Sequence, residues 1–262
     1  MKDISSSHNE TYKHLKKLMS ASKYRRQNRQ TVLEGIHLCQ SYLEQVGAPV
    51  RCFYTDHAKE SQEALEVIEK CTDRSVEVIL ISESKFREVS TLVNGIGLLF
   101  VISQPSLEAP GLIDGSALLL DGVQDPGNLG SILRTAAAAG IGEVYLSNDT
   151  VAAWSPKVLR AGMGAQFVLN IYENVNLQGL VAKSQVPVLA TSLEASESIY
   201  DKDLSGPIAW LFGGEGRGVS DDLLAMKVEQ VIIPQQPNVE SLNVAASAAV
   251  CLFEQVRQAR SI

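Results

Sequence analysis

The chain has 262 residues, of which 45% are hydrophobic and 20% are charged, with a formal net charge of −7. This composition is typical of a globular protein with room for two modest domains. No stretch approaches eighteen apolar residues and the first ten residues are polar, so we expect neither a membrane span nor a secretory signal. The four cysteines lack metal-ligand spacing, which predicts a reduced, cytoplasmic protein without a bound metal.

The charge is unevenly distributed along the chain. Residues 1–30 contain eight Lys or Arg and two acidic residues, a net charge of +6, whereas the remainder has 15 basic and 28 acidic residues, a net charge of −13. A basic N-terminal segment suits contact with a polyanion, but a solvated helix has the same composition, and charge alone favours neither interpretation. If the polyanion is RNA, the expected contacts are Lys16, Lys17, Lys23, Arg25 and Arg26.

Residues 1–102 are predicted to form a small α/β domain. The pattern predicts a short helix followed by a basic loop over residues 11–29. Further helices are expected at 32–46, 60–71 and 83–92, and strands at 50–54, 76–81 and 97–102. Residues 103–116 carry two prolines and two glycines without periodicity and are predicted to be a linker.

Residues 117–262 alternate apolar strand candidates with helices. Near-continuous apolar strands with helices between them predict an α/β domain around a parallel sheet that is covered on both faces. Strands are expected at 117–120, 143–147, 167–171, 186–190, 208–212 and 228–233. Helices are expected at 129–139, 156–163, 177–183, 220–227 and 243–260.

A first polar loop follows the strand that ends at Asp121. Asn128 stands where a helix N-cap is expected, and the next helix places Arg134 beside its apolar stripe. An arginine at this position can bind a phosphate or a carboxylate with two parallel hydrogen bonds, although an isolated arginine is more commonly a surface residue.

A second loop, WLFGGEGRGVS at residues 210–220, places Gly213, Gly214, Gly216 and Gly218 around Glu215. Four glycines in six positions indicate a tight turn or a close approach of the backbone to a ligand. The loop is neither a Walker loop nor a dinucleotide-binding fingerprint, because GK[ST] and GxGxxG are missing.

A third loop leads from the apolar strand candidate through Pro234 and presents Ser241 and Asn243 just before a helix. Ser241 is most simply interpreted as a helix cap, but strand-to-helix loops of parallel sheets also bind ligands. The three loops contain no Ser–His or Cys–His pair and no metal cluster. They suit a polar, adenosine-like ligand held by backbone groups, with a hydroxyl and a phosphate positioned nearby.

In order and spacing, these loops resemble the motifs of the SpoU/TrmH family of RNA 2′-O-ribose methyltransferases in the SPOUT superfamily. The matching segments are NLGSILRTA, LFGGEGRGVS and IPQQPNVESLNVAASAA. HLKKLMSASKYR and VLEGIHL resemble the substrate-binding extension that many members carry. The resemblance implies an α/β fold with a deep trefoil knot, a homodimer, and S-adenosylmethionine as the cofactor.

The resemblance also implies the roles of particular residues. Those expected in catalysis are Arg134, Asn128, Glu215, Ser241 and Asn243, and those expected to contact the cofactor are Thr191, Gly213, Ile233 and Leu242. Two positions depart from the family pattern: Pro237 stands where a glycine is usual, and Ala245 replaces the second serine of SLNVS.

The implied reaction is methyl transfer to a ribose 2′-hydroxyl of RNA. The separate basic domain favours large-subunit ribosomal RNA as substrate, and transfer RNA is the alternative. A non-catalytic RNA-binding or assembly protein would not need the four motif residues Asn128, Arg134, Glu215 and Asn243. Nucleotide hydrolysis would need a general base and a metal site, and the sequence offers neither. Because a guanidinium stays protonated in proteins, we expect Arg134 to grip the neighbouring phosphate and polarise the hydroxyl.

Overall fold

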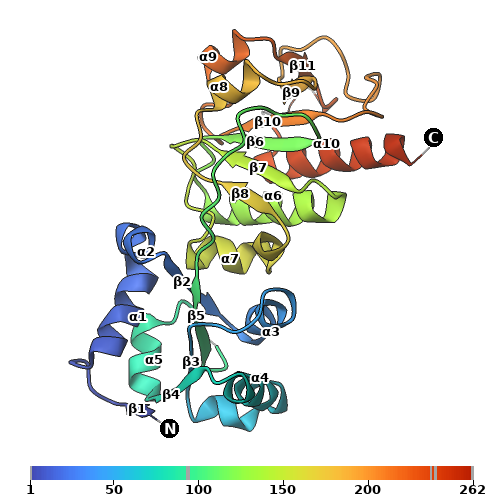
Figure 1. The fold of residues 1–262 in the computed structure, drawn as a ribbon. Coiled ribbons are helices and arrows are strands. Elements are labelled where there is room, and N and C mark those ends of the chain that lie inside the picture. The colour runs from blue at the N-terminus through green and yellow to red at the C-terminus, as the bar shows by residue number, and fades with distance from the viewer. Residues whose placement is uncertain (1, 93–94, 237, 239–240, 261–262) are drawn as a thin grey trace. The chain divides into compact units, whose positions relative to one another are not determined.

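The computed structural model describes residues 2–92, 95–236, 238 and 241–260. The chain divides into two compact units, one with the residues up to 106 together with 154–167, the other with residues 107–153 together with those from 168 onward. Residues 154–167 thus belong to the N-terminal unit, although they lie along the chain inside the predicted second domain. Figure 1 labels the helices and strands of both units.

The N-terminal unit is built around a mixed sheet of five strands in the order β1-β4-β3-β5-β2. Strand β5 is antiparallel to β2 and β3, whereas β4 pairs in parallel with β1 and β3. The elements are β1 Lys2–Ile4, α1 Glu10–Ser20, α2 Ser22–Asn28, β2 Gln30–Glu34, α3 Ile36–Gln45, β3 Arg51–Tyr54, η1 His57–Glu60, α4 Gln62–Asp73, β4 Glu77–Ile81, α5 Glu83–Val89, β5 Leu98–Ser103, α7 Pro156–Gly162 and η2 Ala165–Phe167.

Helices cover both faces of this sheet. Leu15 of α1 and Phe86 of α5 lie in one buried cluster with Phe53 and Ile79 of the sheet. Helices α3 and α4 pack against each other and against the strands, and Figure 1 shows them on the opposite face from α1 and α5. The predicted α/β character of this region therefore holds, with a mixed sheet.

Two predictions in the N-terminal unit are wrong. Residues 32–34 form part of β2, where a helix was expected, and pair with β5. Val32 and Leu33 are both fully buried, and neighbouring apolar residues occur at the buried face of a helix as well as in a strand covered on both sides. Gly35, with φ of 102°, then separates β2 from α3. The expected basic loop after α1 instead forms the helix α2.

The C-terminal unit contains a sheet of six strands in the order β11-β9-β10-β6-β7-β8, and every neighbouring pair is parallel. This confirms the predicted parallel α/β fold, and the knot stays a prediction. The elements are β6 Ala117–Asp121, α6 Pro126–Ala139, β7 Glu143–Leu146, β8 Asn170–Tyr172, α8 Leu177–Val181, β9 Val188–Thr191, β10 Ala209–Gly213, α9 Asp221–Leu224, β11 Glu229–Val231 and α10 Val244–Ala259.

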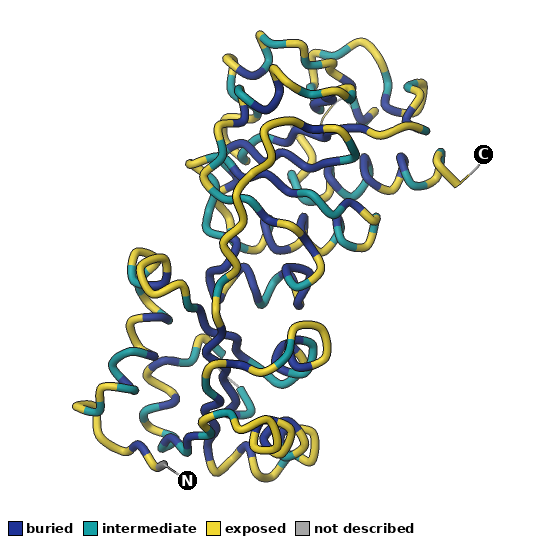
Figure 2. The backbone as a smooth tube through the Cα atoms, viewed as in Figure 1, coloured by how far each residue is buried: buried dark blue, intermediate teal, exposed yellow. Residues whose placement is uncertain are grey.

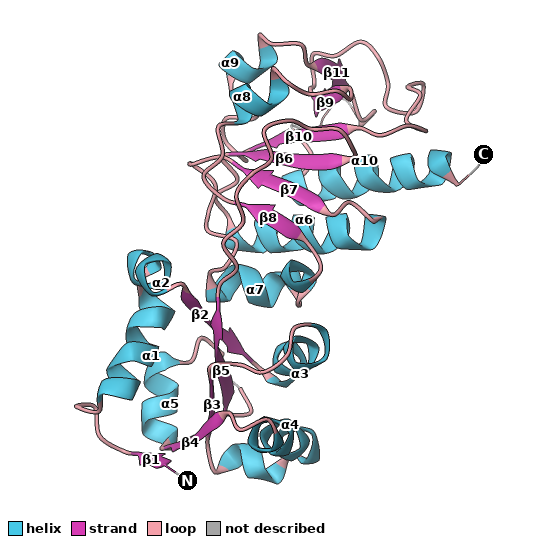
Figure 3. Ribbon diagram, viewed as in Figure 1, coloured by secondary structure: helices cyan, strands magenta, loops and turns pink. Residues whose placement is uncertain are grey.

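Alternation along the strands directs side chains to the two faces of this sheet. Leu119 and Leu211 share a buried cluster with Leu180 of α8 and Leu223 of α9. On the other face, the Trp210 indole donates a hydrogen bond of 2.8 Å to Gln255 of α10. Helix α10 packs beside α6, as Figure 3 shows, and the strands of both units are mostly buried in Figure 2. Packed helices on both faces leave the strand ends as the place for a ligand.

The described helices include none that is both long enough and apolar enough to cross a membrane.

Candidate functional site

The carboxyl ends of β6, β9, β10 and β11 carry most of the predicted site residues. The sheet register pairs Gly213 with Asp121 and Val231 with Thr191, so the strands end in a row. Ile233 follows two residues after β11 and is 8% exposed. Because all these strands run in the same direction, the loops that follow them meet at one edge of the sheet.

A chain of hydrogen bonds joins the three motif loops at this edge. Asn243 Nδ2 donates to Asn128 Oδ1 over 3.0 Å, and Asn128 Nδ2 donates to Glu215 Oε1 over 2.7 Å. Three residues that lie up to 115 positions apart in sequence are thereby brought together. The structure therefore assembles one residue from each predicted motif into a single polar network.

Glu215 is the acceptor at the end of this network. Burial by itself would raise the pKa of Glu215, but hydrogen bonds from the Asn128 side chain and from backbone N–H groups, including those of Gln124 and Asp125, lower this pKa on balance. The carboxylate therefore stays ionised at neutral pH and can accept further hydrogen bonds.

The two helix caps differ from the prediction. Asp125, rather than Asn128, caps α6, because its Oδ1 accepts from the backbone N of Asn128 at 2.8 Å. The Asn128 side chain is consequently available to bridge the loops. Asn243, rather than Ser241, caps α10 through bonds from the backbone N atoms of Ala245 and Ala246. Asn243 thus fixes the start of α10 and the network at once.

Arg134, Ser241 and Leu242 are not joined to this network by any hydrogen bond among the described residues. Arg134 lies on α6 with its side chain exposed, and Leu242 is 38% exposed. Ser241 is also exposed and precedes the helix. Pro237, one of the two departures from the family motif, falls outside the described residues; Ala245, the other, is in the first turn of α10.

Two glycines of the second loop, Gly213 and Gly214, are required by close backbone packing. A Cβ atom on Gly213 would lie 1.9 Å from the carbonyl carbon of Gly218, and one on Gly214 would lie 2.2 Å from the carbonyl oxygen of Gly122. Real Cβ contacts do not occur at such distances, so any side chain would displace the loop. The predicted close approach is made to the protein's own backbone.

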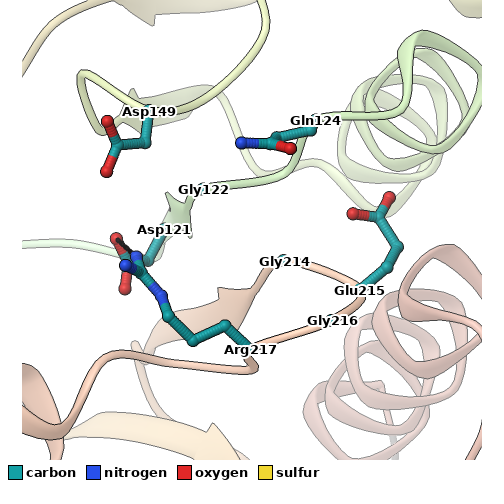
Figure 4. Close-up of a pocket in the computed structure, with 8 residues that line it drawn as sticks. All are labelled: Asp121, Gly122, Gln124, Asp149, Gly214, Glu215, Gly216 and Arg217. Carbon is teal, nitrogen blue, oxygen red and sulfur yellow. Dashed lines mark ion pairs between the residues drawn. The ribbon is translucent and has the colours of Figure 1, made fainter.

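A pocket of about 280 Å³ opens beside this loop (Figure 4). Asp121 is buried at its floor, where Oδ2 accepts from the backbone N of Ser220 at 2.9 Å and Oδ1 lies 3.9 Å from Nη2 of Arg217. The lining residues are Asp121, Gly122, Gln124, Asp149, Gly214, Glu215, Gly216 and Arg217. Sequence analysis missed Gln124, Asp149 and Arg217, although Asp149 follows a strand of the same parallel sheet, which is a usable signal.

The basic residues of the N-terminal unit fall into two groups. Lys16, Lys17, Lys23 and Arg26 are exposed on α1 and α2. Arg25 is 7% exposed, and its Nη1 donates to the carbonyl oxygens of Leu18 (2.8 Å) and Met19 (3.3 Å) at the end of α1. These bonds stabilise the C-terminus of α1 and leave Arg25 little exposed surface for the RNA contact expected of it.

Comparison with known proteins places the chain in a family. Residues 115–253 match the SpoU rRNA Methylase family, and residues 9–99 match the MRM3-like substrate binding domain. A tRNA/rRNA methyltransferase of Synechocystis that is itself uncharacterized is 35% identical, over 97% of this chain and 93% of its own. The 23S rRNA (guanosine-2′-O-)-methyltransferase RlmB of Pseudomonas putida is 31% identical, over 86% of this chain and 95% of its own.

A solved structure agrees with this assignment. The AdoMet-bound rRNA methyltransferase from Sinorhizobium meliloti has a TM-score of 0.83 and 27% identity, covering 98% of this chain and 97% of its own. The parallel α/β unit with three motif loops at one sheet edge thus defines an RNA methyltransferase. The chain belongs to the SpoU rRNA Methylase family, which confirms the predicted enzyme class and its dependence on S-adenosylmethionine. In the described part of the chain, no group of three His, Cys, Asp or Glu residues could hold a metal ion.

Proposed function

We propose that this protein transfers a methyl group from S-adenosylmethionine to a ribose 2′-hydroxyl of large-subunit ribosomal RNA. The observation that carries the proposal is the Asn243–Asn128–Glu215 network, because it links the three motif loops at the ligand-binding edge of the sheet. The name of the Pseudomonas relative, which specifies 23S rRNA and guanosine, supports the substrate class. Transfer RNA is the alternative, since the Synechocystis relative is named for both RNAs.

The residues proposed to hold the cofactor fit an adenosine. Thr191 and Gly213 end adjacent strands and Ile233 follows a third, so backbone groups and an apolar side chain lie at one edge. Leu242 presents a partly exposed apolar side chain, with 38% of its surface exposed. Backbone donors and acceptors suit the edge of an adenine, and apolar side chains suit its faces.

Bound S-adenosylmethionine supplies an electrophilic methyl group on a sulfonium, which is already a good leaving group. The protein's contribution is therefore placement of the acceptor hydroxyl and help in removing its proton. In our proposal Arg134 grips the phosphate next to the target ribose and polarises the 2′-hydroxyl without acting as a base, and the hydroxyl proton passes to solvent water. Asn128, Glu215 and Asn243 hold the loops in register, and Ser241 contacts the nucleotide.

The N-terminal unit is proposed to bind the RNA. Lys16, Lys17, Lys23 and Arg26 are exposed on α1 and α2, where a phosphate backbone can reach them. Lys17 Nζ lies 5.3 Å from the centre of the Tyr24 ring, and Lys16 Nζ lies 3.3 Å from a Glu88 carboxylate oxygen. Lys23 and Arg26 make no ion pair with any described residue, so we expect them to contribute most.

We also propose a homodimer in the cytoplasm. Phe253 on α10 is 48% exposed, and Ala246, about two turns earlier on the same side of the helix, is exposed too. A second copy of this chain would cover this apolar stripe. Replacing Phe253 with Asp should shift the sedimentation coefficient from that of a dimer to that of a monomer, and an unchanged value would contradict the proposed interface.

The experiment that tests the reaction is tritium transfer from labelled S-adenosylmethionine to ribosomal and transfer RNA from a host lacking this gene. Wild type, Arg134→Ala and Arg134→Lys are compared. We expect alkali-resistant label in large-subunit RNA with wild type and almost none with either variant, because lysine lacks the two-pronged geometry. Label in transfer RNA alone would overturn the substrate, and full activity of Arg134→Lys would overturn the role of bidentate binding. No label in either RNA would contradict the proposed reaction.

A further inference from the structure

The pocket beside the second loop lies on one side of β10 in the sheet, and two of the proposed cofactor residues, Thr191 and Ile233, lie on the other. In the sheet order β11-β9-β10-β6-β7-β8, Thr191 ends β9 and Ile233 follows β11, on one side of β10. Asp121 ends β6 and Asp149 follows β7, on the other side of β10. A transfer reaction needs a donor and an acceptor on opposite sides of the transferred group, so the pocket is placed for the acceptor.

The charges of the pocket select against a phosphate. Three carboxylates, of Asp121, Asp149 and Glu215, line it together with one guanidinium, that of Arg217. A net negative lining repels a phosphate and favours a ligand that offers N–H donors. Its volume of about 280 Å³ is at the small end of ligand pockets, which suits a single nucleoside.

Two polar side chains at the mouth of the pocket, those of Gln124 and Asp149, have unused hydrogen-bonding groups. Asp121 already accepts from Ser220, and Glu215 already accepts from Asn128. Figure 4 shows the Gln124 amide extending across the opening in the direction of Asp149, whose carboxylate lies on the side away from Gln124. Neither of these two side chains makes a hydrogen bond or ion pair with any residue that the structure describes.

We propose that this pocket binds the base of the acceptor nucleotide and that Asp149 selects guanine. Guanine is the RNA base whose Watson–Crick edge presents two adjacent donors, N1–H and the N2 amino group, and these match the two oxygens of one carboxylate. The O6 atom beside them accepts from the Gln124 amide. The base enters as an unstacked nucleotide, which is the usual form in which proteins read RNA sequence. The inference rests on the proposed methyl transfer to RNA and adds the residues that read the base.

The test compares wild type with Asp149→Asn, which keeps the shape of the side chain and replaces an acceptor with a donor. Asp201→Asn is the matched control, because Asp201 is exposed in the same unit and does not line the pocket. Methylated ribosomal RNA is digested to nucleosides and the 2′-O-methylated base is identified by mass spectrometry. A synthetic RNA of the mapped site is then made with guanosine or with inosine, which lacks the N2 amino group, at the target.

We expect wild type and Asp201→Asn to produce 2′-O-methylguanosine. Asp149→Asn should lose roughly 10- to 100-fold in kcat/KM on the guanosine RNA while keeping the full rise in Tm with S-adenosylmethionine. Inosine should cost the wild type roughly tenfold and cost Asp149→Asn little.

Three results would overturn the inference. Undiminished transfer by Asp149→Asn would show that Asp149 does not recognise the base. Equal use of guanosine and inosine by wild type would show the same. A wild-type product on another base would overturn the choice of guanine while leaving the proposed reaction intact. Absence of RNA methylation by wild type would instead refute the proposed function, and the inference with it.

Discussion

Two carboxylates, one in each unit, hold neighbouring loops together in opposite environments. The side chain of Glu34, at the end of β2, is only 3% exposed. It accepts from the Ser90 hydroxyl and from the N–H and hydroxyl of Thr91, and it lies 3.8 Å from Nη1 of Arg160. Glu215, just after β10, is exposed and accepts from Asn128.

The difference separates a structural network from a site. The oxygens of Glu34 are supplied with donors entirely by the protein and solvent hardly reaches them, so its network stabilises the fold. Glu215 is exposed to solvent and borders an open pocket, so its network is placed to meet a ligand. A polar cluster at a strand end is thus interpreted by its exposure and by the space beside it, in addition to its residue types.

Replacing Glu215 with Ala should have the largest effect on activity. We expect methyl transfer to fall about 100-fold, because the second loop loses its bond to Asn128, while the free energy of unfolding changes by less than about 1 kcal/mol at this exposed position. Transfer rates and thermal unfolding are measured together, with Glu194→Ala as the exposed control in the same unit. Unchanged activity of Glu215→Ala would place Glu215 with Glu34 as a structural residue.

The second loop allows a comparison between two of its own glycines. A Cβ on Gly214 would lie 2.2 Å from the Gly122 carbonyl oxygen, whereas a Cβ on Gly216 would meet no described atom within 4 Å. Gly214→Ala should therefore displace the loop, lower transfer about 10- to 100-fold and cost about 1–3 kcal/mol in stability. Gly216→Ala should leave stability close to that of wild type, and equal losses of stability in the two variants would exclude backbone packing as the cause.

Replacing Glu34 with Ala should reverse the pattern seen for Glu215. Arg160, the Thr91 N–H and two hydroxyls would lose their buried acceptor, so we expect a loss of about 2–4 kcal/mol in the free energy of unfolding. The rise in Tm on adding S-adenosylmethionine should remain, because the proposed cofactor residues belong to the other unit. Glu44→Ala, on the exposed face of α3, serves as the control and should be nearly neutral.

The sequence predicted the C-terminal sheet well because near-continuous apolar strands such as β6 and β10 leave few alternatives. It also predicted that Asn128, Glu215 and Asn243 share a site, although this came from family motifs rather than from periodicity. Periodicity failed at Val32, since adjacent buried positions fit a helix or a strand covered on both faces. Asp149 was missed although it follows a predicted strand, because which loops of the sheet meet depends on strand order, which no local pattern encodes.

Helix α2 carries an exposed arginine, Arg26, and a buried one, Arg25, which allow a smaller test of the distinction between a ligand-binding and a structural side chain. The double change Lys23→Ala and Arg26→Ala should weaken RNA binding several-fold and lower the slope of log affinity against log salt by about 1–2. Arg25→Ala should leave that slope unchanged and lower Tm, because the Leu18 and Met19 carbonyls lose their donor. Filter binding at several salt concentrations and thermal unfolding separate the two effects. A lower slope of log affinity against log salt with Arg25→Ala would show that Arg25 contacts the RNA.

The smallest expected effect concerns acid stability, where each unit has one comparable carboxylate. A hydrogen bond from Arg257, and to a smaller extent one from Gln258, lowers the pKa of Glu254 on α10 to about 2. A hydrogen bond from Lys85, and to a smaller extent one from Tyr12, lowers the pKa of Glu88 on α5 to about 2. A carboxyl whose pKa is lower in the folded state stabilises the fold above its unfolded value of 4.5, and this contribution is lost as pH falls from 4.5 toward 2. Glu254→Gln should therefore cost about 1 kcal/mol at pH 7 and flatten the fall in Tm of the C-terminal unit below pH 4.5. Glu88→Gln should flatten that of the N-terminal unit alone. If either change altered the acid profile of both units equally, the two would unfold as one cooperative body, and stability could not be assigned to Glu34 or Glu215 separately.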